Sequence, residues 1–418
     1  MKPQSNNSVK AISYNETKDL CFHKVDLQAL LKGEMAPLYF YSLQALEQRL
    51  HQVLEGLAKS CQGPFAIHYA MKANRHPDVL QFFQKSGIGI DVVSGGEMTR
   101  ALGAGFQPDK IIFSGVGKTS AELTRAVELS IKQINVESIP ELKRLGQIAK
   151  SLDKKVQIGL RVNPDVDVKT HPYIATGLRE NKFGIDLSQL TEVIEILRQN
   201  PLLSLRGLSL HIGSQLTEFS ALSEAIQKIK AVYDDLIKLK FPLKSLDIGG
   251  GIGIQYDQDE ESDQVIFQEF CQVLKNDLGS FSGEVMMEPG RFLVARAGVL
   301  LAQVEYVKET PWKKFLILNT GMHHFLRPAL YQAKHRILPL RNTLRKSQKY
   351  DVVGPVCESS DFLAKNIELP EMREGEWVAI LDTGAYGAVM SSTYNDFPPA
   401  HELTRPAGFW NAAHNGEG

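Results

Sequence analysis

The segment QINVESIPELKRLGQIAKSLDKKVQIGLRVNP (133–164) contains two short β-like runs on either side of one amphipathic stretch. The runs are QINVES (133–138) and VQIGLRVNP (156–164), and short apolar runs of this kind suit strands buried on both faces of a parallel sheet. In the stretch that joins them, apolar residues recur at helical spacing with charged residues between them. The segment therefore predicts a strand, a helix and a second strand parallel to the first.

The same alternation extends from about residue 60 to residue 290. Six further runs occur there: FAIHYAMK (65–72), GIDVVS (89–94), KIIFSG (110–115), LRGLSLHIG (205–213), SLDIGGG (245–251) and EVMMEPG (284–290). Eight strands that alternate with helices predict an eight-fold (β/α)8 barrel of the TIM type. A doubly wound open sheet is the alternative, and the count of eight favours the barrel.

The two ends of the chain have a different pattern. From about residue 293 onward, short β-like runs dominate and helical periodicity is weak, which predicts an all-β domain. Residues 1–38 are too short for a domain of their own and are expected to add a strand or two to it. We therefore expect an α/β barrel over residues 37–292 and a β domain of Greek-key or sandwich type formed by residues 1–36 and 293–418.

Composition limits the class of protein. The formal net charge is −1 over 418 residues, so the chain lacks the basic excess of a nucleic-acid binder and no nucleic-acid partner is expected. Apolar runs of about 18 residues do not occur and the start MKPQSNNSVK is polar, so we expect neither a membrane span nor a signal peptide. The four cysteines are scattered without a CxxC pair, which argues against a zinc ribbon and favours a reducing, cytoplasmic compartment.

One connection in the predicted barrel is long. The segment NPDVDVKTHPYIATGLRENKFGID (163–186) carries His171, Pro172 and Tyr173 among many polar residues. Connections longer than about 12–15 residues without secondary structure are usually functional or disordered. We interpret this one as an active-site loop.

Polar residues and glycines gather where the predicted strands end. In an α/β barrel these ends form one face, and that face carries the active site. The residues there are Lys72, Asp91, Ser94, Arg161, Asn163, His211, Ser214, Gly249, Gly250, Gly251, Glu288 and Arg291. Each alone fits a polar residue where a strand enters solvent, but six strands ending in complementary chemistry indicate an active site.

Three features of this face point to one cofactor. Lys72 is either a solvated strand end or, if desolvated in the barrel mouth, a Schiff-base nucleophile. The turns GGGIG (249–253) and EPGR (288–291) are either tight turns or a phosphate cradle after the seventh and eighth strands. Residue 254 is not the glycine that a dinucleotide fingerprint needs, and no Walker lysine is present, so the smaller phosphate of a mononucleotide-like ligand is favoured.

A reactive lysine beside a phosphate cradle suggests pyridoxal 5′-phosphate. Its ring nitrogen needs a carboxylate that keeps it protonated, and Glu288 suits that role. His211 is either a stacking partner of the ring or a core histidine that is satisfied by backbone groups.

The motifs in their order resemble those of a known family. They are YAMKAN, DVVSGGE, RVNP, THPYIATGL, HIGSQ, DIGGGIG, EPGR, RPALY, CESSD and GAYG, and they extend from about residue 37 to 397. This set resembles the barrel-type pyridoxal-phosphate-dependent decarboxylases, and among them the diaminopimelate decarboxylases. The resemblance implies a carboxy-lyase that converts meso-2,6-diaminopimelate to L-lysine and CO2, the last step of lysine biosynthesis.

The resemblance also implies a role for each matching residue. Lys72 would carry the cofactor and Cys357 would donate a proton after decarboxylation. The implied cofactor-binding residues are Lys72, Asp91, Arg161, His211, Ser214, Gly250, Gly251, Glu288, Gly290, Arg291 and Tyr386. The implied substrate-binding residues are Arg291, Arg327, Tyr331, Glu358 and Tyr386. A homodimer is implied as well, in which the CESSD and GAYG segments complete the site of the partner subunit.

Some features depart from the pattern or leave alternatives open. Gln332 and Ser360 stand where the family pattern has glycine, and His323 and His324 in TGMHHF are interpreted as surface histidines without a metal.

Relatives on the same fold decarboxylate ornithine, arginine or carboxynorspermidine. A pyridoxal-phosphate-dependent racemase and a non-catalytic cofactor-binding protein are the alternatives from other classes. The intact Lys72, Glu288 and Cys357 favour a decarboxylase.

Overall fold

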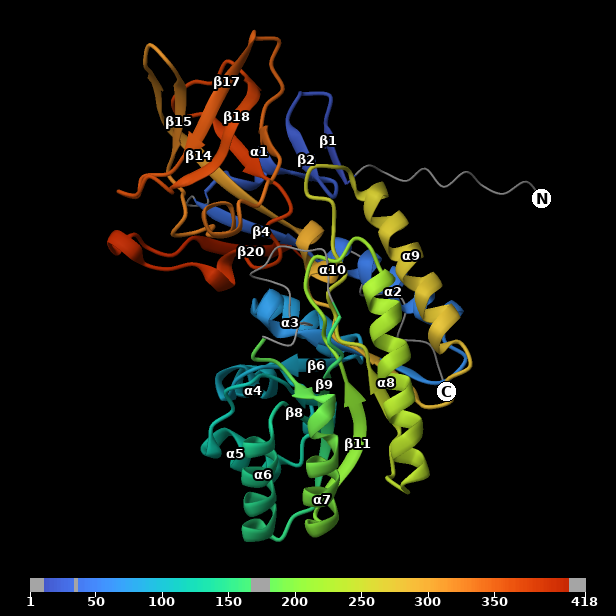
Figure 1. Ribbon diagram of the computed structural model, residues 1–418. Helices are drawn as coiled ribbons and strands as arrows, with labels where there is room; N and C mark the ends of the chain where they lie inside the picture. The colour runs from blue at the N-terminus through green and yellow to red at the C-terminus, as the bar shows by residue number, and fades with distance from the viewer. Residues whose placement is uncertain (1–10, 34–36, 167–180, 406–418) are drawn as a thin grey trace, which may run out of the picture. The chain divides into compact units, whose positions relative to one another are not determined.

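Eight parallel strands close into a barrel in the middle of the chain (Figure 1). The computed structural model describes residues 11–33, 37–166 and 181–405. In barrel order the strands are β5 (Phe65–Ala70), β6 (Gly89–Val92), β7 (Ile111–Phe113), β8 (Gln133–Val136), β9 (Val156–Asn163), β11 (Leu203–Ser209), β12 (Ser245–Asp247) and β13 (Glu284–Met287). Pairing of β13 with β5 and of β8 with β9 closes the ring. The predicted barrel is confirmed, and the open sheet is excluded.

Helices connect the barrel strands. They are α3 (Pro77–Lys85), α4 (Gly95–Gly103), α5 (Ser120–Leu129), α6 (Ile139–Leu152), α7 (Leu190–Gln199), α8 (Ser220–Lys238) and α9 (Glu260–Leu278), and α2 (Leu43–Ser60) precedes the first strand. Several begin at a side-chain cap next to a strand end: the hydroxyls of Ser94, Thr119 and Ser138 accept the backbone N–H three residues on. Such caps satisfy the free N–H groups of a first turn, so the sequence fixes where each strand ends and each helix starts.

The interior of the barrel is polar. Inward-facing positions include the buried side chains of His68, Gln133, Asn135, Ser245 and Asp247. Two glycines on neighbouring strands make room for them: a Cβ on Gly159 would lie 2.4 Å from the side chains of Gln133 and Asn135, and one on Gly207 would lie 2.3 Å from Ser245 Oγ. The barrel therefore holds hydrogen-bonding groups beneath its mouth.

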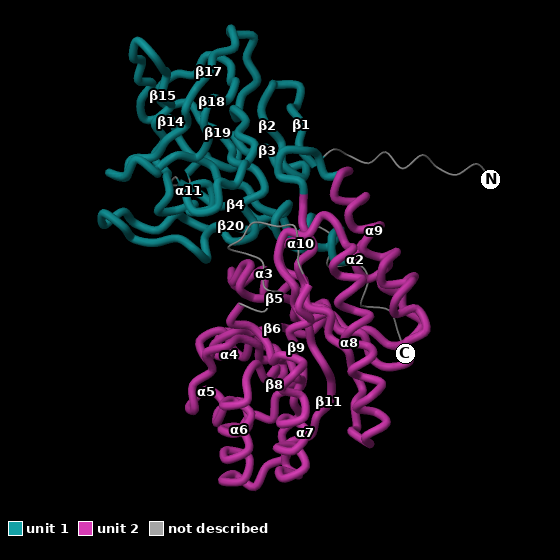
Figure 2. Tube along the Cα trace, in the orientation of Figure 1, with its two compact units in different colours: residues 1–50, 255–260, 293–418 teal, residues 51–254, 261–292 magenta. Residues whose placement is uncertain are grey.

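The chain divides into two compact units (Figure 2). Unit 2 comprises residues 51–254 and 261–292 and holds the barrel, whereas unit 1 comprises residues 1–50, 255–260 and 293–418. The short segment 255–260 belongs to unit 1 because Arg296 donates to the carbonyls of Gln255 and Gln258, at 2.6 and 3.0 Å.

Unit 1 is built on one mixed sheet. Its main path runs β16 (Ile337–Pro339), β19 (Trp377–Ile380), β14 (Gly298–Glu309), β15 (Lys314–Leu318), β17 (Ser347–Val353) and β18 (Phe362–Pro370). The N-terminal β4 (Leu38–Ser42) pairs with β14 on one side and with the C-terminal β20 (His401–Arg405) on the other. Both chain ends therefore contribute strands to unit 1, called the β unit below. This confirms the predicted β domain formed by both ends of the chain.

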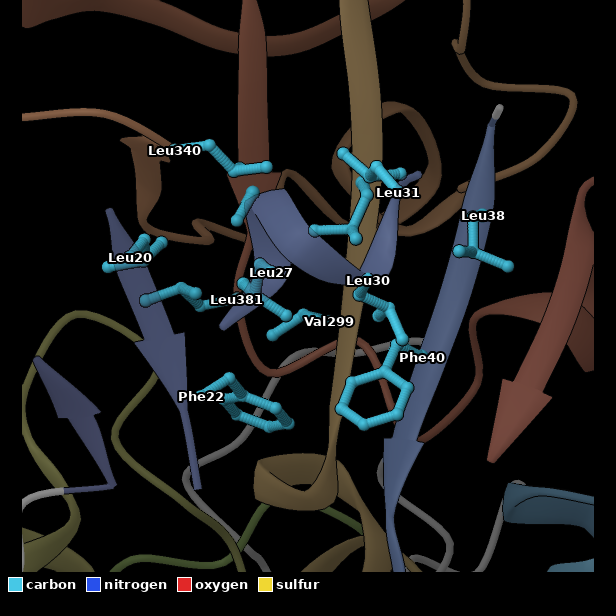
Figure 3. Close-up of a cluster of buried hydrophobic side chains, with 12 residues drawn as sticks. Leu20, Phe22, Leu27, Leu30, Leu31, Leu38, Phe40, Val299, Leu340 and Leu381 are labelled. Atoms are coloured by element: carbon cyan, nitrogen blue, oxygen red, sulfur yellow. The ribbon is translucent and has the colours of Figure 1, made fainter. Parts of the chain in front are cut away.

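The N-terminal segment also supplies much of the core of unit 1 (Figure 3). It forms β1 (Ile12–Tyr14), β2 (Leu20–Phe22), β3 (Val25–Asp26) and the short helix α1 (Leu27–Leu30). Leu27 and Phe40 are fully buried against side chains that include Val299 and Leu381. No helix within the described ranges is long and apolar enough to cross a membrane.

We predict that Leu27→Ala destabilises unit 1 by about 2–5 kcal/mol, because it leaves a cavity in a closed core. Leu344→Ala is the matched control, since Leu344 is 95% exposed and its truncation opens no cavity. Urea unfolding of both variants measures the difference. Equal stabilities would show that the cluster around Leu27 is not a core.

Candidate active site

Lys72 and Asp91 meet at the mouth of the barrel. Lys72 lies in the 3-10 turn Met71–Ala73 that directly follows β5, and Asp91 lies on β6, where it pairs in register with Ala70. The Nζ of Lys72 is 3.4 Å from Oδ2 of Asp91; the carboxylate is buried, and the lysine side chain is 40% exposed. The amine therefore has a counter-charge on one side and access to solvent on the other.

His211 is held as a neutral ring beyond the end of β11. Its Nδ1 accepts the backbone N–H of Gly250 at 3.2 Å, so in a neutral ring the proton lies on Nε2. Desolvation, followed by the charges of Arg161 and Lys72, lowers the pKa of His211 well below its usual value. An uncharged imidazole at this place suits a stacking role better than an acid–base role at neutral pH.

Glu288 lies just past β13. Its Oε1 accepts hydrogen bonds from Ser114 Oγ and Asn135 Nδ2, each at 3.3 Å. The carbonyl of Glu288 lies so close to the glycine turn that a Cβ on Gly250 would approach it to 2.2 Å, which restricts position 250 to glycine. The backbone of the turn therefore packs directly on the segment that carries Glu288.

Arg161 is fixed by a carboxylate on the neighbouring strand end. Its Nη1 donates to both oxygens of Glu137 at 3.0 Å, and its guanidinium lies 4.9 Å from the ring centroid of Phe183. Glu137 also accepts the backbone N–H of Gly115 at 2.7 Å. The negative charge of Glu137 therefore pairs with Arg161 and holds it in place.

A hydrogen bond joins the HIGS and EPGR segments. Nη2 of Arg291, at the start of α10 (Arg291–Val294), donates to Oγ of Ser214 at 3.0 Å. Next to them, Gly251 has a φ of 96°, and a Cβ there would lie 2.3 Å from the carbonyl of Gly213. The structure thus brings together all the predicted barrel residues at the carboxyl ends of the strands: Lys72, Asp91, Arg161, His211, Ser214, Gly250, Gly251, Glu288, Gly290 and Arg291.

The remaining predicted site residues lie in unit 1. Arg327 and Tyr331 are on α11 (Arg327–Tyr331), Cys357 and Glu358 follow β17, and Tyr386 follows β19 with a φ of 56°.

Arg327 is buried and oriented by a histidine. Its Nε donates to Nε2 of His335 at 3.3 Å, so His335 carries its proton on Nδ1 and donates it to the carbonyl of Leu381 at 2.8 Å. The guanidinium also lies 4.9 Å from the ring centroid of Tyr256 and 5.9 Å from that of Tyr331. These contacts fix the orientation of the Arg327 guanidinium.

Asp361 organises the turn that carries Cys357 and Glu358. One of its carboxylate oxygens accepts the backbone N–H of Met322 at 2.6 Å, and the other accepts that of Val356 at 2.7 Å. The thiol of Cys357 is free and exposed. This arrangement holds the thiol at a defined place without shielding it.

Several of these residues were missed at the level of sequence. Glu137, Asn135 and Ser114 hold the predicted groups from below, and Asp361 and Tyr394 hold those of unit 1; the hydroxyl of Tyr394 donates to Glu358 at 2.8 Å. The polar alternation in QINVES is the signal that could have found Glu137 and Asn135, because alternate residues of a barrel strand face inward. Asp361 lay inside the quoted CESSD motif without a role.

The interpretation of His323 and His324 as surface histidines is wrong, because each is 1% exposed. His324 is fixed between Thr320, at 3.1 Å, and the carbonyl of Pro398, at 2.8 Å. In the described part of the chain, no group of three or more potential metal ligands occurs.

The two departures from the family pattern have different environments. Gln332 has a φ of 52°, a left-handed conformation that favours glycine, whereas Ser360 Oγ lies 3.7 Å from Sδ of Met322. Most of the predicted active-site loop, residues 167–180 with His171, Pro172 and Tyr173, lies outside the described residues.

Comparison with known proteins supplies the family. Residues 43–295 match the family model for the pyridoxal-dependent decarboxylase, pyridoxal binding domain. Diaminopimelate decarboxylase of Vibrio cholerae is 44% identical over 392 residues, which cover 94% of this chain and 92% of that protein. The chain belongs to the diaminopimelate decarboxylase family.

Other members of the diaminopimelate decarboxylase family agree. The enzyme of Aquifex aeolicus is 40% identical over 93% of this chain and 92% of its own length. The crystal structure of the Helicobacter pylori enzyme, complexed with L-lysine, has a TM-score of 0.86 and 40% identity, and the match covers 91% of this chain and 94% of that one. The fold and the family assignment thus rest on nearly the whole chain.

Pyridoxal phosphate is the cofactor of this family, and the barrel residues fit it. Lys72 supplies an amine at the mouth, and the buried Asp91 and Asp247 each keep one carboxylate oxygen without a hydrogen-bond partner in the described structure. The glycine turn at 249–251 exposes backbone where a Cβ would clash, as a close-fitting phosphate site requires. An amine, a neutral ring, an interior carboxyl and a glycine cradle are the groups that this cofactor needs.

We predict that Asp361→Ala lowers the free energy of unfolding by at least about 2 kcal/mol, because two backbone N–H groups lose their acceptor. Turnover should fall by about tenfold or more as the Cys357 turn loosens, while cofactor content stays unchanged, since the backbone groups that Asp361 holds, those of Met322 and Val356, belong to unit 1 and not to the barrel. Urea unfolding, CO2 release and cofactor absorbance measure the three effects. Ser360→Ala is the control, and a comparable loss in that variant would contradict the role assigned to Asp361.

Proposed function

We propose that the chain catalyses the pyridoxal-phosphate-dependent decarboxylation of meso-2,6-diaminopimelate to L-lysine and CO2, the last step of lysine biosynthesis. The observation that carries this proposal is the Lys72–Asp91 pair at the barrel mouth, in a domain whose residues 43–295 match the pyridoxal binding domain. The relatives from Vibrio cholerae and Aquifex aeolicus are diaminopimelate decarboxylases, and the Helicobacter pylori enzyme binds L-lysine, the product.

The barrel residues would hold the cofactor from several sides. Lys72 would bind it covalently, His211 would stack on its ring and Glu288 would face its ring nitrogen. Its phosphate would lie among Ser214, Gly250, Gly251, Gly290 and Arg291. When bound, the cofactor supplies a ring that accepts the electron pair left as the Cα–carboxylate bond breaks.

The groups of unit 1 would bind the substrate. The forked guanidinium of Arg327 suits a carboxylate, as does that of Arg291 in the barrel, and Glu358 suits the distal ammonium. Tyr331 and Tyr386 would contact the substrate, and the Cys357 thiol would deliver a proton to Cα. A second carboxylate and a second amine on one molecule favour diaminopimelate over ornithine, arginine or carboxynorspermidine.

A homodimer with shared sites is part of the proposal. The chemistry is divided between Lys72 in the barrel and Cys357 in the β unit, and in this arrangement the Cys357 and Tyr386 segments complete the site of the partner subunit. A cytoplasmic location is consistent with a free Cys357 thiol, because a reducing compartment keeps it available.

We expect the purified chain to release CO2 and L-lysine from meso-diaminopimelate. Lys72→Ala should abolish both this activity and the covalent attachment of the cofactor, because no other barrel-mouth residue of the proposed site is a lysine. A substrate panel with ornithine and arginine completes the measurement. Turnover of ornithine or arginine without turnover of diaminopimelate would contradict the proposed substrate.

Cys357→Ala should lower turnover and keep the cofactor bound. Mixing it with the inactive Lys72→Ala should raise activity above that of either variant alone, up to about a quarter of the wild-type value if subunits exchange and share sites, because half of the dimers then pair the two variants and each of these holds one intact site. The mixture is assayed after co-expression. Failure of complementation in verified mixed dimers would refute the shared site.

A further inference from the structure

Two carboxyl groups, those of Asp247 and Glu288, lie together inside the barrel. Asp247 ends β12, Glu288 follows the neighbouring β13, and the backbone N–H of Glu288 donates to the carbonyl of Gly249 at 2.7 Å. The two side chains lie within hydrogen-bonding reach of each other. Asp247 is fully buried.

The charges around this pair are already balanced. Lys72 pairs with Asp91 at 3.4 Å, Lys118 with Glu141 at 2.8 Å and Arg161 with Glu137 at 3.0 Å. In the described part of the chain, no lysine, arginine or histidine forms an ion pair with Asp247 or Glu288. Two adjacent carboxylates without a cation, one fully buried and the other partly buried, are too costly to be ionised together.

The hydrogen bonds of Asp247 also indicate that the two carboxyl groups are not ionised together. Oδ1 of Asp247 accepts the backbone N–H of Gly249 at 2.8 Å, whereas Oδ2 has no N–H or O–H donor in the described chain. A carboxylate can only accept, so Asp247 and Glu288 can bond to each other only when one of them carries a proton.

We propose that Asp247 and Glu288 share one proton and that Asp247 is a positioning residue for the cofactor. In the cofactor-free chain the proton lies on Glu288 and is donated to Oδ2 of Asp247. When a protonated ring nitrogen faces Glu288, the proton crosses the same hydrogen bond to Asp247 Oδ2, and Glu288 becomes the carboxylate. The single negative charge of the pair then matches the single positive charge of the ring.

The surroundings favour a pair that keeps its proton at neutral pH. Burial, together with the weaker effect of the Asp91 charge, raises the pKa of Asp247 to about 6, although the hydrogen bonds with Gly249 and Glu288 and the charge of Lys132 act in the opposite direction. Burial also raises the pKa of Glu288 well above its usual value, with Asp247 and Asp91 adding to it and Lys72 and Arg161 opposing.

The inference rests on the proposed function only for the role of Glu288 at the ring nitrogen. The full chain, freed of cofactor, is therefore examined by infrared spectroscopy at neutral pH. We expect a protonated-carboxyl band that disappears in Asp247→Asn and in Glu288→Gln. Glu284→Gln is the matched control on β13: Glu284 pairs with Lys132 at 3.5 Å, and its loss should leave the band unchanged.

Pyridoxal phosphate itself is the second probe. Asn at 247 keeps the acceptor for Gly249 and donates permanently to Glu288, so its affinity should stay within about threefold of wild type, whereas Asp247→Leu should bind at least about tenfold more weakly. A wild-type chain without the band, or an Asp247→Asn variant as weak as Asp247→Leu, would overturn the proposal. A chain with the band that releases no CO2 from diaminopimelate would instead overturn the proposed function alone.

Discussion

The parallel ladders that join β8 to β9 and β13 to β5 are the constraint on which the site depends. Closing the ring brings the carboxyl ends of eight strands to one mouth, so residues as distant in sequence as Lys72 and Glu288 become neighbours. An open sheet would leave the first and last strands at opposite edges. The chemistry of the barrel is therefore a product of its closure.

Closure also forces polar groups into a confined interior, where each needs a partner. Several of these groups are held in short local pairs: Lys118 Nζ donates to two carbonyls and to Glu141, and Glu137 holds Arg161. Burying a charge is costly unless it is paired and hydrogen-bonded. The site thus consists of neutralised pairs around two carboxyl groups, Asp247 and Glu288, which form no ion pair among the described residues.

The fold and the residues at the barrel mouth could be predicted from the sequence. Few of the residues that hold those side chains in place could be predicted. Eight apolar runs in alternation with helices predicted the barrel, and the strand ends predicted where Lys72, His211 and Glu288 lie. The supporting residues escaped because their role depends on contacts across the fold: Asp361 accepts from Met322, which is distant in the chain. His323 and His324 were misplaced for the same reason, since local pattern does not reveal that the segment 392–398 folds over them.

The pairing of β4 with β20 has a consequence for how the protein is made. Leu38 of β4 lies opposite His401 of β20, so β4 cannot form this ladder until about 360 more residues have been synthesised. Contacts between such distant segments form slowly, because a long loop must close before they gain any stability. The barrel strands, in contrast, are complete on the ribosome well before residue 401 emerges. The β4–β20 ladder is therefore a late step of folding, and until it forms the edge of β4 that pairs with β20 stays without that partner.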